Sequence, residues 1–328
     1  MRDCIHTMIS SSKCNDIADP ILSGRELYHK GLALGRDGKH EEAFLMFSDA
    51  LAVDPTFVLA WVGRGFALGK LGHFEEEIAC CDKAIELDPS CVDAWNFKGF
   101  ALGKLGRFEE KVNCCRRALD MNPESAVAWN NMGVAVGMLR KYEDEVRCCE
   151  RAIVLRPRFL SAWVNKGYAL GKLKRYDEEC ACYDRALKIY PYYFSALVNR
   201  SAALIRLKQY REAIESLDQV LSIDPGNAKA LYRKGLVLAM LRRHEEAIPV
   251  LEKSLTINPT IADAWVVLSN SYFLLGNLDA SARAFDQAYY IDIHDVRVGF
   301  VRGLSLLKAG KRDEGLRCFS DVLGILLR

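Results

Sequence analysis

Cysteine is the residue type in this chain whose number and spacing most suggest chemistry. Three vicinal pairs precede two further cysteines: Cys80-Cys81, Cys114-Cys115, Cys148-Cys149, Cys180 and Cys182. A vicinal pair is a poor metal clamp, and no Cys-x-x-Cys pair or nearby histidine set completes a four-ligand zinc site. Cysteines that recur on successive packed helices lie about 10 Å apart, which is too far for a disulfide. We therefore interpret them as small apolar packing residues, with a thiol-based redox or metal-handling role as the alternative.

The other residues that could support catalysis form no recognisable set. The six histidines have no metalloprotease spacing, and no nucleophile, base and acid stand together; they are His6, His29, His40, His73, His244 and His294. Glycines between Gly63 and Gly69 have the wrong spacing for a dinucleotide loop, and Leu71 follows Gly69-Lys70 where a phosphate loop needs Ser or Thr. The sequence predicts no catalytic residues, no metal site and no cofactor, and hence no enzyme.

The composition is that of an ordinary folded protein. The 328 residues include 45 basic and 43 acidic side chains, with a net charge of +2 and 50% hydrophobic residues. Because the charges are mixed along the chain, neither nucleic acid nor a membrane surface is an expected partner. No run of 18 apolar residues occurs, and the first residues do not resemble a secretory signal. We expect a cytoplasmic protein with reduced thiols.

The prolines reveal an internal repeat. Seven of the nine are 34 residues apart: Pro55, Pro89, Pro123, Pro157, Pro191, Pro225 and Pro259. If each repeat is counted so that this proline is in the thirty-second place, nine repeats start at residues 24, 58, 92, 126, 160, 194, 228, 262 and 296. The array then covers residues 24–328. Residues 1–23 are left as an N-terminal segment, expected to be partly disordered or a capping helix.

The residues at fixed places within the repeat predict two helices. All five tryptophans are in the fourth place: Trp61, Trp95, Trp129, Trp163 and Trp265. The eighth place is always Gly or Ser, and apolar residues recur at steps of three and four, which indicates helix rather than strand. Five repeats have glycine in the fifteenth place, where a helix end favours a residue that can adopt positive φ.

These residues resemble the tetratricopeptide repeat, whose 34-residue pattern combines Trp, Leu-Gly, Tyr, Ala, Phe, Ala and Pro at set places. The resemblance covers about nine tenths of the chain. It implies an all-α fold, an α-solenoid in which about nine antiparallel helix pairs form a right-handed superhelix. The first helices would line a concave groove and the second helices its convex back, and the function would be to bind a partner.

One departure from the family pattern involves charged residues. The family expects Ala in the twentieth place, but the second to fifth repeats have Glu77, Lys111, Glu145 and Glu179. The same repeats have glycine in the twelfth place. Our hypothesis is that the missing side chain on the first helix makes room for the longer one on the second. The alternative is a solvated charge at a tilted helix edge.

The groove-facing places implied by the resemblance carry amides and aromatic rings. An amide can donate to a backbone carbonyl and accept from a backbone N–H, so a row of asparagines suits an extended peptide, and we expect Asn131 and Asn165 to point into solvent. The row consists of Asn96, Asn130, Asn131, Asn165 and Asn199, with Phe66, Phe97, Phe100, Tyr168 and Tyr232 beside it and Lys70, Lys104, Lys172 and Arg206 along one edge.

A second binding pattern is only partly present. Asn199, Lys229 and Arg233 match the chaperone-binding carboxylate clamps by position, and such clamps grip a C-terminal carboxylate by charge-assisted hydrogen bonds. The Lys and Asn that the preceding repeat should supply are Val164 and Tyr168 here. Two of the five clamp residues are therefore absent.

The function that we predict is a non-catalytic scaffold that holds an extended peptide or a partner's helix in the groove. The alternatives are a chaperone adaptor with a partial clamp, a thiol-based redox or metal-handling protein, and an accessory subunit of an enzyme on another chain. The apolar C-terminal repeat, with Leu316 and Phe319 followed by Val322 to Leu327, also predicts possible self-association.

Overall fold

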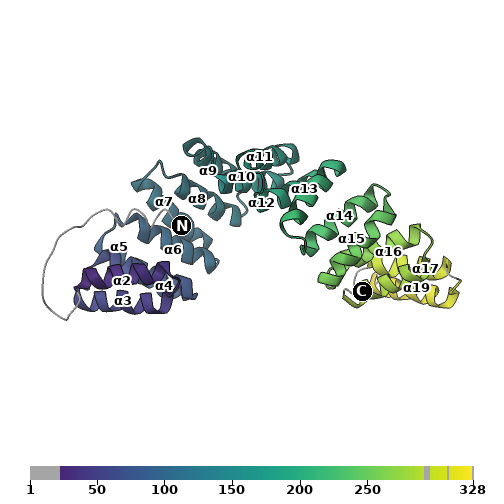
Figure 1. Ribbon diagram of the computed structural model, residues 1–328, viewed down its shortest axis with the longest axis horizontal. Helices are drawn as coiled ribbons and strands as arrows, with labels where there is room; N and C mark the ends of the chain where they lie inside the picture. The colour runs from purple at the N-terminus through teal and green to yellow at the C-terminus, as the bar shows by residue number, and fades with distance from the viewer. Residues whose placement is uncertain (1–22, 292–295, 309, 327–328) are drawn as a thin grey trace. The chain divides into compact units, whose positions relative to one another are not determined.

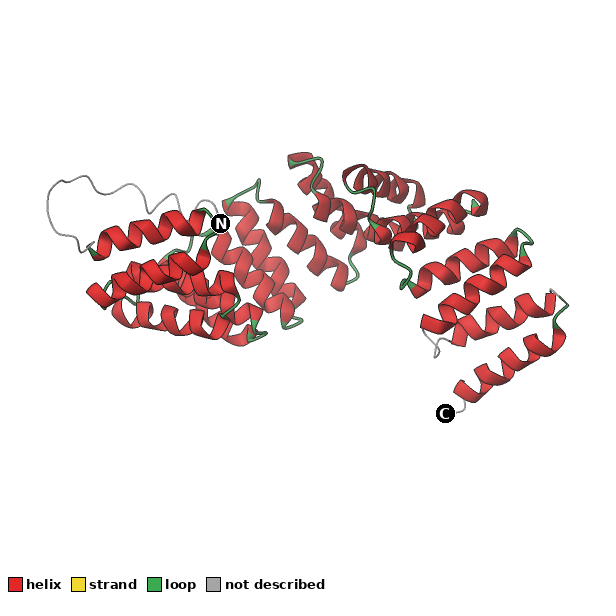
Figure 2. Cartoon of the chain, turned by 60° about the horizontal axis from the view of Figure 1, so that its bottom comes forward, coloured by secondary structure: helices red, strands yellow, loops and turns green. Residues whose placement is uncertain are grey.

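The computed structural model describes residues 23–291, 296–308 and 310–326 (Figure 1). The described part is all helical, with 18 helices, α2 to α19, arranged as sequential antiparallel pairs (Figure 2). This confirms the predicted fold class. The chain divides into two compact units, an N-terminal unit that ends at Ala135 and a C-terminal unit that begins at Val136.

Each 34-residue repeat contributes one helix pair. The first helices are α2 (Gly24–Arg36), α4 (Val58–Leu71), α6 (Val92–Lys104), α8 (Ala126–Met138), α10 (Leu160–Lys172), α12 (Phe194–Arg206), α14 (Ala228–Met240), α16 (Ala262–Leu274) and α18 (Val296–Lys308). The second helices are α3 (His40–Val53), α5 (Phe74–Leu87), α7 (Phe108–Met121), α9 (Tyr142–Leu155), α11 (Tyr176–Ile189), α13 (Tyr210–Ile223), α15 (His244–Ile257), α17 (Leu278–Ile291) and α19 (Arg312–Leu326). Each first helix begins at the residue where the sequence repeat begins.

Glycines on two successive first helices, Gly31 in the eighth place and Gly63 in the sixth, let a large side chain fit between helices. Phe47 on α3 is 2% exposed. A Cβ built on Gly31 of α2 would lie 2.8 Å from its ring, and one built on Gly63 of α4 would lie 2.6 Å from it. Carbon atoms do not approach so closely, because dispersion contacts are optimal at about 3.5 to 4.0 Å. The absence of a side chain on both neighbouring helices is therefore what allows Phe47 to fill the core.

The tryptophans in the fourth place join successive repeats by a hydrogen bond as well as by packing. In all five cases the indole N–H donates to the backbone carbonyl of the proline six residues earlier, over 2.8 to 3.0 Å. Proline lacks an N–H, and its carbonyl lies beyond the end of the preceding helix. The bond gives each recurring tryptophan a polar partner in the preceding repeat, which the sequence did not indicate.

The fifteenth place adopts a left-handed backbone in every repeat, whichever residue occupies it. Five of these residues are glycines, with φ between 76° and 89°. The other four are Arg140, Lys174, Lys208 and Arg242, with φ between 60° and 63°. The left-handed region costs a residue with a Cβ about 1 to 2 kcal/mol, so these four positions are strained.

Replacing one of these residues by glycine should stabilise the protein. We expect Lys174→Gly to raise the free energy of unfolding by about 0.5 to 1 kcal/mol, since the relief of strain exceeds the greater backbone entropy of glycine in the unfolded chain. Urea denaturation followed by circular dichroism measures the change. The converse substitution, Gly72→Lys, should lower stability by a similar amount, and a loss of stability in Lys174→Gly would contradict the explanation.

The glycines in the twelfth place face the charged residues in the twentieth place, as we hypothesised. A Cβ built on Gly69 would lie 2.2 Å from Oε2 of Glu77, and one on Gly137 would lie 2.0 Å from Oε2 of Glu145. Glu77, Glu145 and Glu179 are at most 4% exposed. For these three glutamates the alternative of a solvated charge at the helix edge is wrong.

Two predictions concern residues outside the described part. Residues 1–22 and the side chains from Val322 to Leu327 are not among the described ones. Leu316, which precedes them on α19, is 51% exposed. The N-terminal segment and the self-association of the C-terminal repeat stay predictions.

Candidate functional site

The predicted groove residues lie on first helices of both units. In the N-terminal unit α6 carries Asn96, Phe97 and Phe100, and α8 carries Asn130 and Asn131. In the C-terminal unit the residues are Asn165 and Tyr168 on α10, Asn199 on α12, and Lys229, Tyr232 and Arg233 on α14. Helices α4 and α6 contact each other, as do α10 and α12. Each unit thus has its own set of these residues, with Phe66, Lys70 and Lys104 in the N-terminal unit and Lys172 in the C-terminal unit. We call the surface that such a set forms the first-helix face of its unit.

A lysine lies over an aromatic ring in three repeats of this face. The distance from Nζ to the ring centroid is 5.3 Å for Lys70 over Phe66 and 5.4 Å for Lys104 over Phe100 in the N-terminal unit. In the C-terminal unit the corresponding distance for Lys172 over Tyr168 is 5.1 Å. Each lysine is four residues after its ring, so the helix itself brings the two together. Distances below about 6 Å are those of cation–π interactions.

Aromatic rings also connect neighbouring first helices within the N-terminal unit. The Phe66 ring on α4 and the Phe97 ring on α6 have centroids 5.5 Å apart and an interplanar angle of 56°. Phe100 remains 38% exposed, and Tyr168 in the C-terminal unit is 48% exposed. These rings offer apolar surface to a ligand, and the lysines beside them offer hydrogen-bond donors.

The asparagines are less exposed than we expected. Asn130 is buried, at 7% exposed. Asn96, Asn131, Asn165 and Asn199 are half-buried. Asn131 and Asn165 are therefore partly accessible, and the expectation that they point into solvent stays a prediction.

The residues of the partial clamp differ in their surroundings. Lys229 is exposed. Arg233 is half-buried, and its guanidinium donates to the backbone carbonyl of Val198 on α12 over 3.4 Å. Burial lowers the pKa of Arg233, which shows that its charge is partly desolvated. Val164, where a clamp needs a lysine, is 8% exposed and packs in the core.

Buried carboxylates lie beneath the glycines of the first helices. Burial raises the pKa of Glu77 to about 8 and that of Glu145 to about 7. The pKa of Glu179 is also raised by burial, but Arg206 lies 3.2 Å from its carboxylate and opposes the shift. Tyr183 donates a hydrogen bond to the same carboxylate over 3.2 Å. Glu77 is therefore largely protonated at neutral pH, whereas Glu145 is largely protonated only below it.

The recurring cysteines are packed in the helix interfaces. All those in the vicinal pairs, together with Cys180 and Cys182, are buried. Burial raises the pKa of seven of these thiols, for instance to about 11 for Cys80, Cys148 and Cys182. A protonated thiol is neither a nucleophile nor a metal ligand. Among the described residues, no three His, Cys, Asp or Glu side chains come together as a possible metal site.

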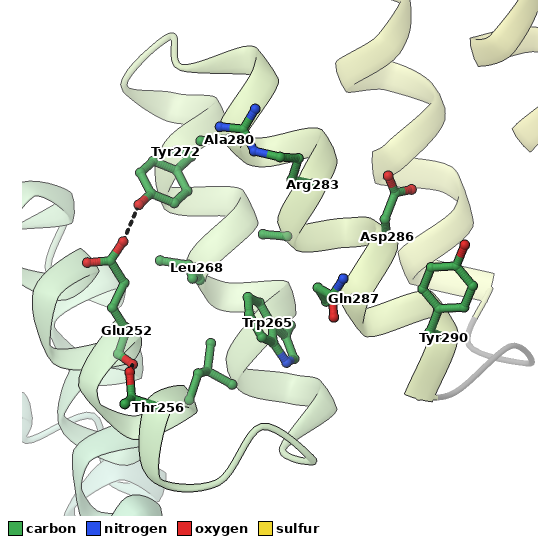
Figure 3. A pocket seen from close by; sticks show the side chains of 12 residues that line it. Glu252, Thr256, Trp265, Leu268, Tyr272, Ala280, Arg283, Asp286, Gln287 and Tyr290 are labelled. Atoms are coloured by element: carbon green, nitrogen blue, oxygen red, sulfur yellow. Dashed lines mark hydrogen bonds between the residues drawn. The ribbon is translucent and has the colours of Figure 1, made fainter.

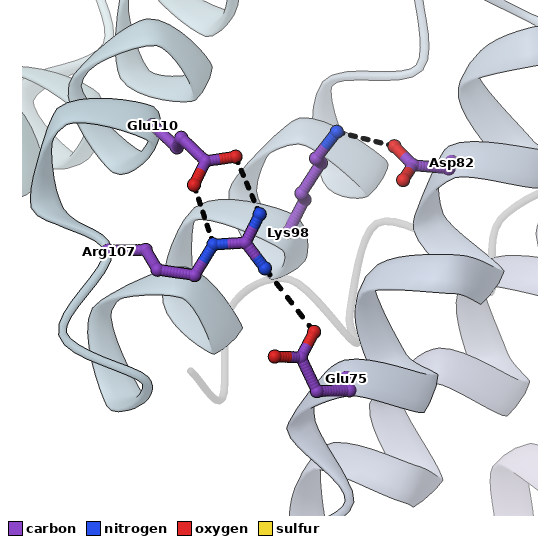
Figure 4. A network of polar contacts seen from close by, with 5 residues as sticks. All are labelled: Glu75, Asp82, Lys98, Arg107 and Glu110. Atoms are coloured by element: carbon purple, nitrogen blue, oxygen red, sulfur yellow. Dashed lines mark hydrogen bonds and ion pairs between the residues drawn. The ribbon is translucent and has the colours of Figure 1, made fainter.

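A row of ion pairs between repeats was not predicted from the sequence. A lysine or arginine in the seventh place of one repeat, on its first helix, forms an ion pair with a carboxylate in the twenty-fifth place of the preceding repeat, on that repeat's second helix. We call each such pair a rung. The described rungs are Lys98–Asp82 (2.5 Å), Lys166–Glu150 (2.8 Å), Arg200–Asp184 (2.7 Å), Lys234–Asp218 (2.6 Å) and Arg302–Asp286 (2.5 Å). Figure 4 shows the first of them beside Arg107, which bonds to Glu75 and Glu110.

Comparison with known families identifies the repeats. Models of the tetratricopeptide repeat match residues 92–125, 160–193, 200–260 and 262–292. A model of the protein prenyltransferase alpha subunit repeat matches residues 74–105. No curated protein matches the sequence. Among the described helices, none is long and apolar enough to cross a membrane.

Solved structures share the fold at low sequence identity. A tetratricopeptide repeat protein from Parabacteroides merdae is 15% identical, with a TM-score of 0.57, and the alignment covers 76% of this chain and 98% of that one. YrrB, described as a TPR protein with an unusual peptide-binding site, is 19% identical with a TM-score of 0.51, over 60% of this chain and 97% of its own. The structure of the APC/C hetero-tetramer Cut9-Hcn1 is 16% identical with a TM-score of 0.52, and the alignment covers 92% of this chain and 73% of that one. The 34-residue helix pairs, the family matches and these structures agree, and the chain is a tetratricopeptide repeat protein.

Proposed function

We propose that this chain is a non-catalytic scaffold that binds extended segments of a partner protein on the first-helix face of each unit. The observation that carries the proposal is the recurrence, in three repeats, of a lysine over an aromatic ring, with asparagines nearby on the same face. A recurring set of this kind suits a ligand that is itself repetitive, and the backbone of an extended peptide is such a ligand. Rings can pack on its side chains while lysine and asparagine bond to its peptide groups.

The family supports the general function. Tetratricopeptide repeat proteins are typically scaffolds for protein–protein interactions and are usually non-catalytic. Of the similar structures, YrrB is described as having a peptide-binding site and Cut9-Hcn1 as an assembly of two kinds of chain. We infer that this chain also binds a protein segment, and that the first-helix face is the binding site.

The experiment begins with a pull-down from native lysate and continues with the purified partner. Replacing Asn131 and Asn165 together by Ala should weaken binding by roughly fivefold to a hundredfold, since each lost hydrogen bond is worth about 0.5 to 1.5 kcal/mol. Because both side chains are half-buried, circular dichroism and thermal unfolding must show that the helices remain. Isothermal titration calorimetry measures the affinity.

Two controls separate this site from the partial clamp. Replacing Lys229 and Arg233 by Ala should change the affinity less than the asparagine variant does. Amidation of the partner's C-terminus should also have little effect, because an extended segment is held along its length. If binding disappears on amidation and the Lys229 and Arg233 variant is the weaker binder, the chaperone-adaptor reading replaces the one proposed here.

A further inference from the structure

The row of rungs is interrupted between α15 and α16 of the C-terminal unit. Leu268 occupies the seventh place and is 3% exposed, whereas Glu252 retains the carboxylate in the twenty-fifth place. Tyr272 on α16 donates its hydroxyl to Oε1 of Glu252 over 2.5 Å. The ion pairs among the described residues do not include Glu252. This carboxylate therefore lacks the cation that its counterparts in five other repeats have.

Another interruption, between α7 and α8 of the N-terminal unit, shows a different change. There the seventh place is Met132 and the twenty-fifth place is Arg116, so both members of the pair differ and no carboxylate is left. Between α15 and α16 only the cation is replaced. The acidic member remains in the position where, elsewhere in the protein, it binds a basic side chain.

A pocket of about 940 Å³ lies at this interruption, between α15 and α17 and across α16 (Figure 3). Leu255 and Leu268 contribute apolar surface, and Trp265 contributes an aromatic ring system. Glu252 lines the wall formed by α15. The pocket thus combines a path for an aliphatic stem with a carboxylate at its side.

We propose that this pocket binds a lysine or arginine side chain of a partner protein, which supplies the cation that the interrupted rung lacks. The stem of a basic side chain can cover apolar surface while its charged head reaches a carboxylate. An ion pair between a basic side chain and the carboxylate in the twenty-fifth place is the contact made in the five intact rungs, and Glu252 offers the same carboxylate. The site is separate from the first-helix face, because none of the residues that line the pocket belongs to that face.

The other charges that line the pocket agree with this occupant. Asp286 on α17 is already paired with Arg302 at 2.5 Å. Arg283 on α17 is exposed and lies near Tyr272, away from Trp265 in Figure 3. Burial and the hydrogen bond to Glu252 raise the pKa of Tyr272 to about 12, so near neutral pH its hydroxyl stays a donor and Glu252 stays the acceptor. An incoming cation would approach Glu252 from the side of Trp265, where Arg283 repels it least.

The test uses a short peptide with a single basic side chain. The probe is acetyl-Gly-Gly-Arg-Gly-Gly-amide, and the matched peptide has citrulline, which is uncharged and nearly isosteric, in place of arginine. Titration of the full chain is followed by NMR at the indole N–H of Trp265, assigned with a Trp265→Phe variant. We expect the arginine peptide to bind at least about tenfold more tightly than the citrulline peptide. Equal binding of the two peptides would overturn the proposal.

Two variants locate the effect at the interrupted rung. Leu268→Lys places a cation opposite Glu252, as in the other repeats, and should abolish the response. Glu252→Gln, at an exposed residue, should weaken binding at least about tenfold. Asp218→Asn, at an intact rung, is the control and should leave the response unchanged. The proposal fails if both Leu268→Lys and Glu252→Gln still bind the peptide while circular dichroism shows native helix content, or if an acidic peptide binds more tightly through Arg283.

Discussion

Replacing Trp129 by Ala should cost about 3 to 5 kcal/mol of unfolding free energy and loosen the third and fourth repeats more than the rest of the chain. Trp129 packs against a cluster that contains the buried residues Ala118 and Leu119. Its indole N–H also donates to the carbonyl of Pro123 over 2.8 Å. Both contacts join α8 to the preceding repeat. In an array where each repeat contacts mainly its neighbours, the loss should stay local.

Hydrogen exchange measured peptide by peptide is the appropriate readout. Protection should fall in α7 and α8, and the repeats at the two ends should change least. The matched variant Trp129→Phe keeps most of the ring packing but removes the hydrogen bond, so it should cost about 1 kcal/mol for the bond in addition to a small packing loss. Val127→Ala, at an exposed residue of the same helix, should have almost no effect. A uniform loss of protection along the chain would contradict local coupling.

The sequence predicted the helices well, because the contacts that determine them recur at fixed places. The tryptophan in the fourth place and the proline in the thirty-second place bond to each other in the structure. The small eighth place faces a large side chain such as Phe47. Each of these contacts involves neighbouring helices only. The pattern of one 34-residue repeat is therefore nearly sufficient to predict where its two helices lie.

The candidate site could be predicted only in part. The places that carry Phe100 and Tyr168 were found, but the burial of Asn130 was not, because it depends on how closely successive first helices pack rather than on the place in the repeat. Positive φ at Lys174 was also missed. Lysine gives no signal of a left-handed backbone, although glycine at the same place in other repeats is such a signal.

The rungs did leave a signal in the sequence. A basic residue in the seventh place accompanies an acidic one in the twenty-fifth place of the repeat before, as with Lys98 and Asp82. Such a correlation is visible only when the two places are known to lie opposite each other, and that depends on the packing of one repeat on the next. The exception at Leu268 becomes meaningful only after the other pairs are known.

The buried glutamates should make the protein less stable as the pH rises. The unfolded chain has an ordinary glutamate pKa of about 4.3, whereas burial raises the pKa of Glu77 in the folded protein to about 8. Below the unfolded pKa both states are protonated, and the stability contributed by the buried group is fully present. Between the two values the unfolded state ionises while the folded state keeps its proton, so stability is lost as the pH rises through the folded pKa. Each unit of difference corresponds to about 1.4 kcal/mol.

Replacing Glu77 by Gln should remove this dependence, because an amide resembles the protonated carboxyl and cannot ionise. We expect Glu77→Gln and the wild-type protein to be similar in stability at pH 4.5 and the variant to be more stable by a few kcal/mol at pH 8.5, as measured by urea denaturation at each pH. Glu76→Gln, on the same helix but with a side chain 63% exposed, should show no such difference. Glu179→Gln should gain less or lose stability, since its buried carboxylate pairs with Arg206 at 3.2 Å and the substitution removes that ion pair. If the difference in unfolding free energy between Glu77→Gln and wild type does not vary with pH, Glu77 must be ionised in the folded protein. A charged carboxylate would then lie buried against Gly69.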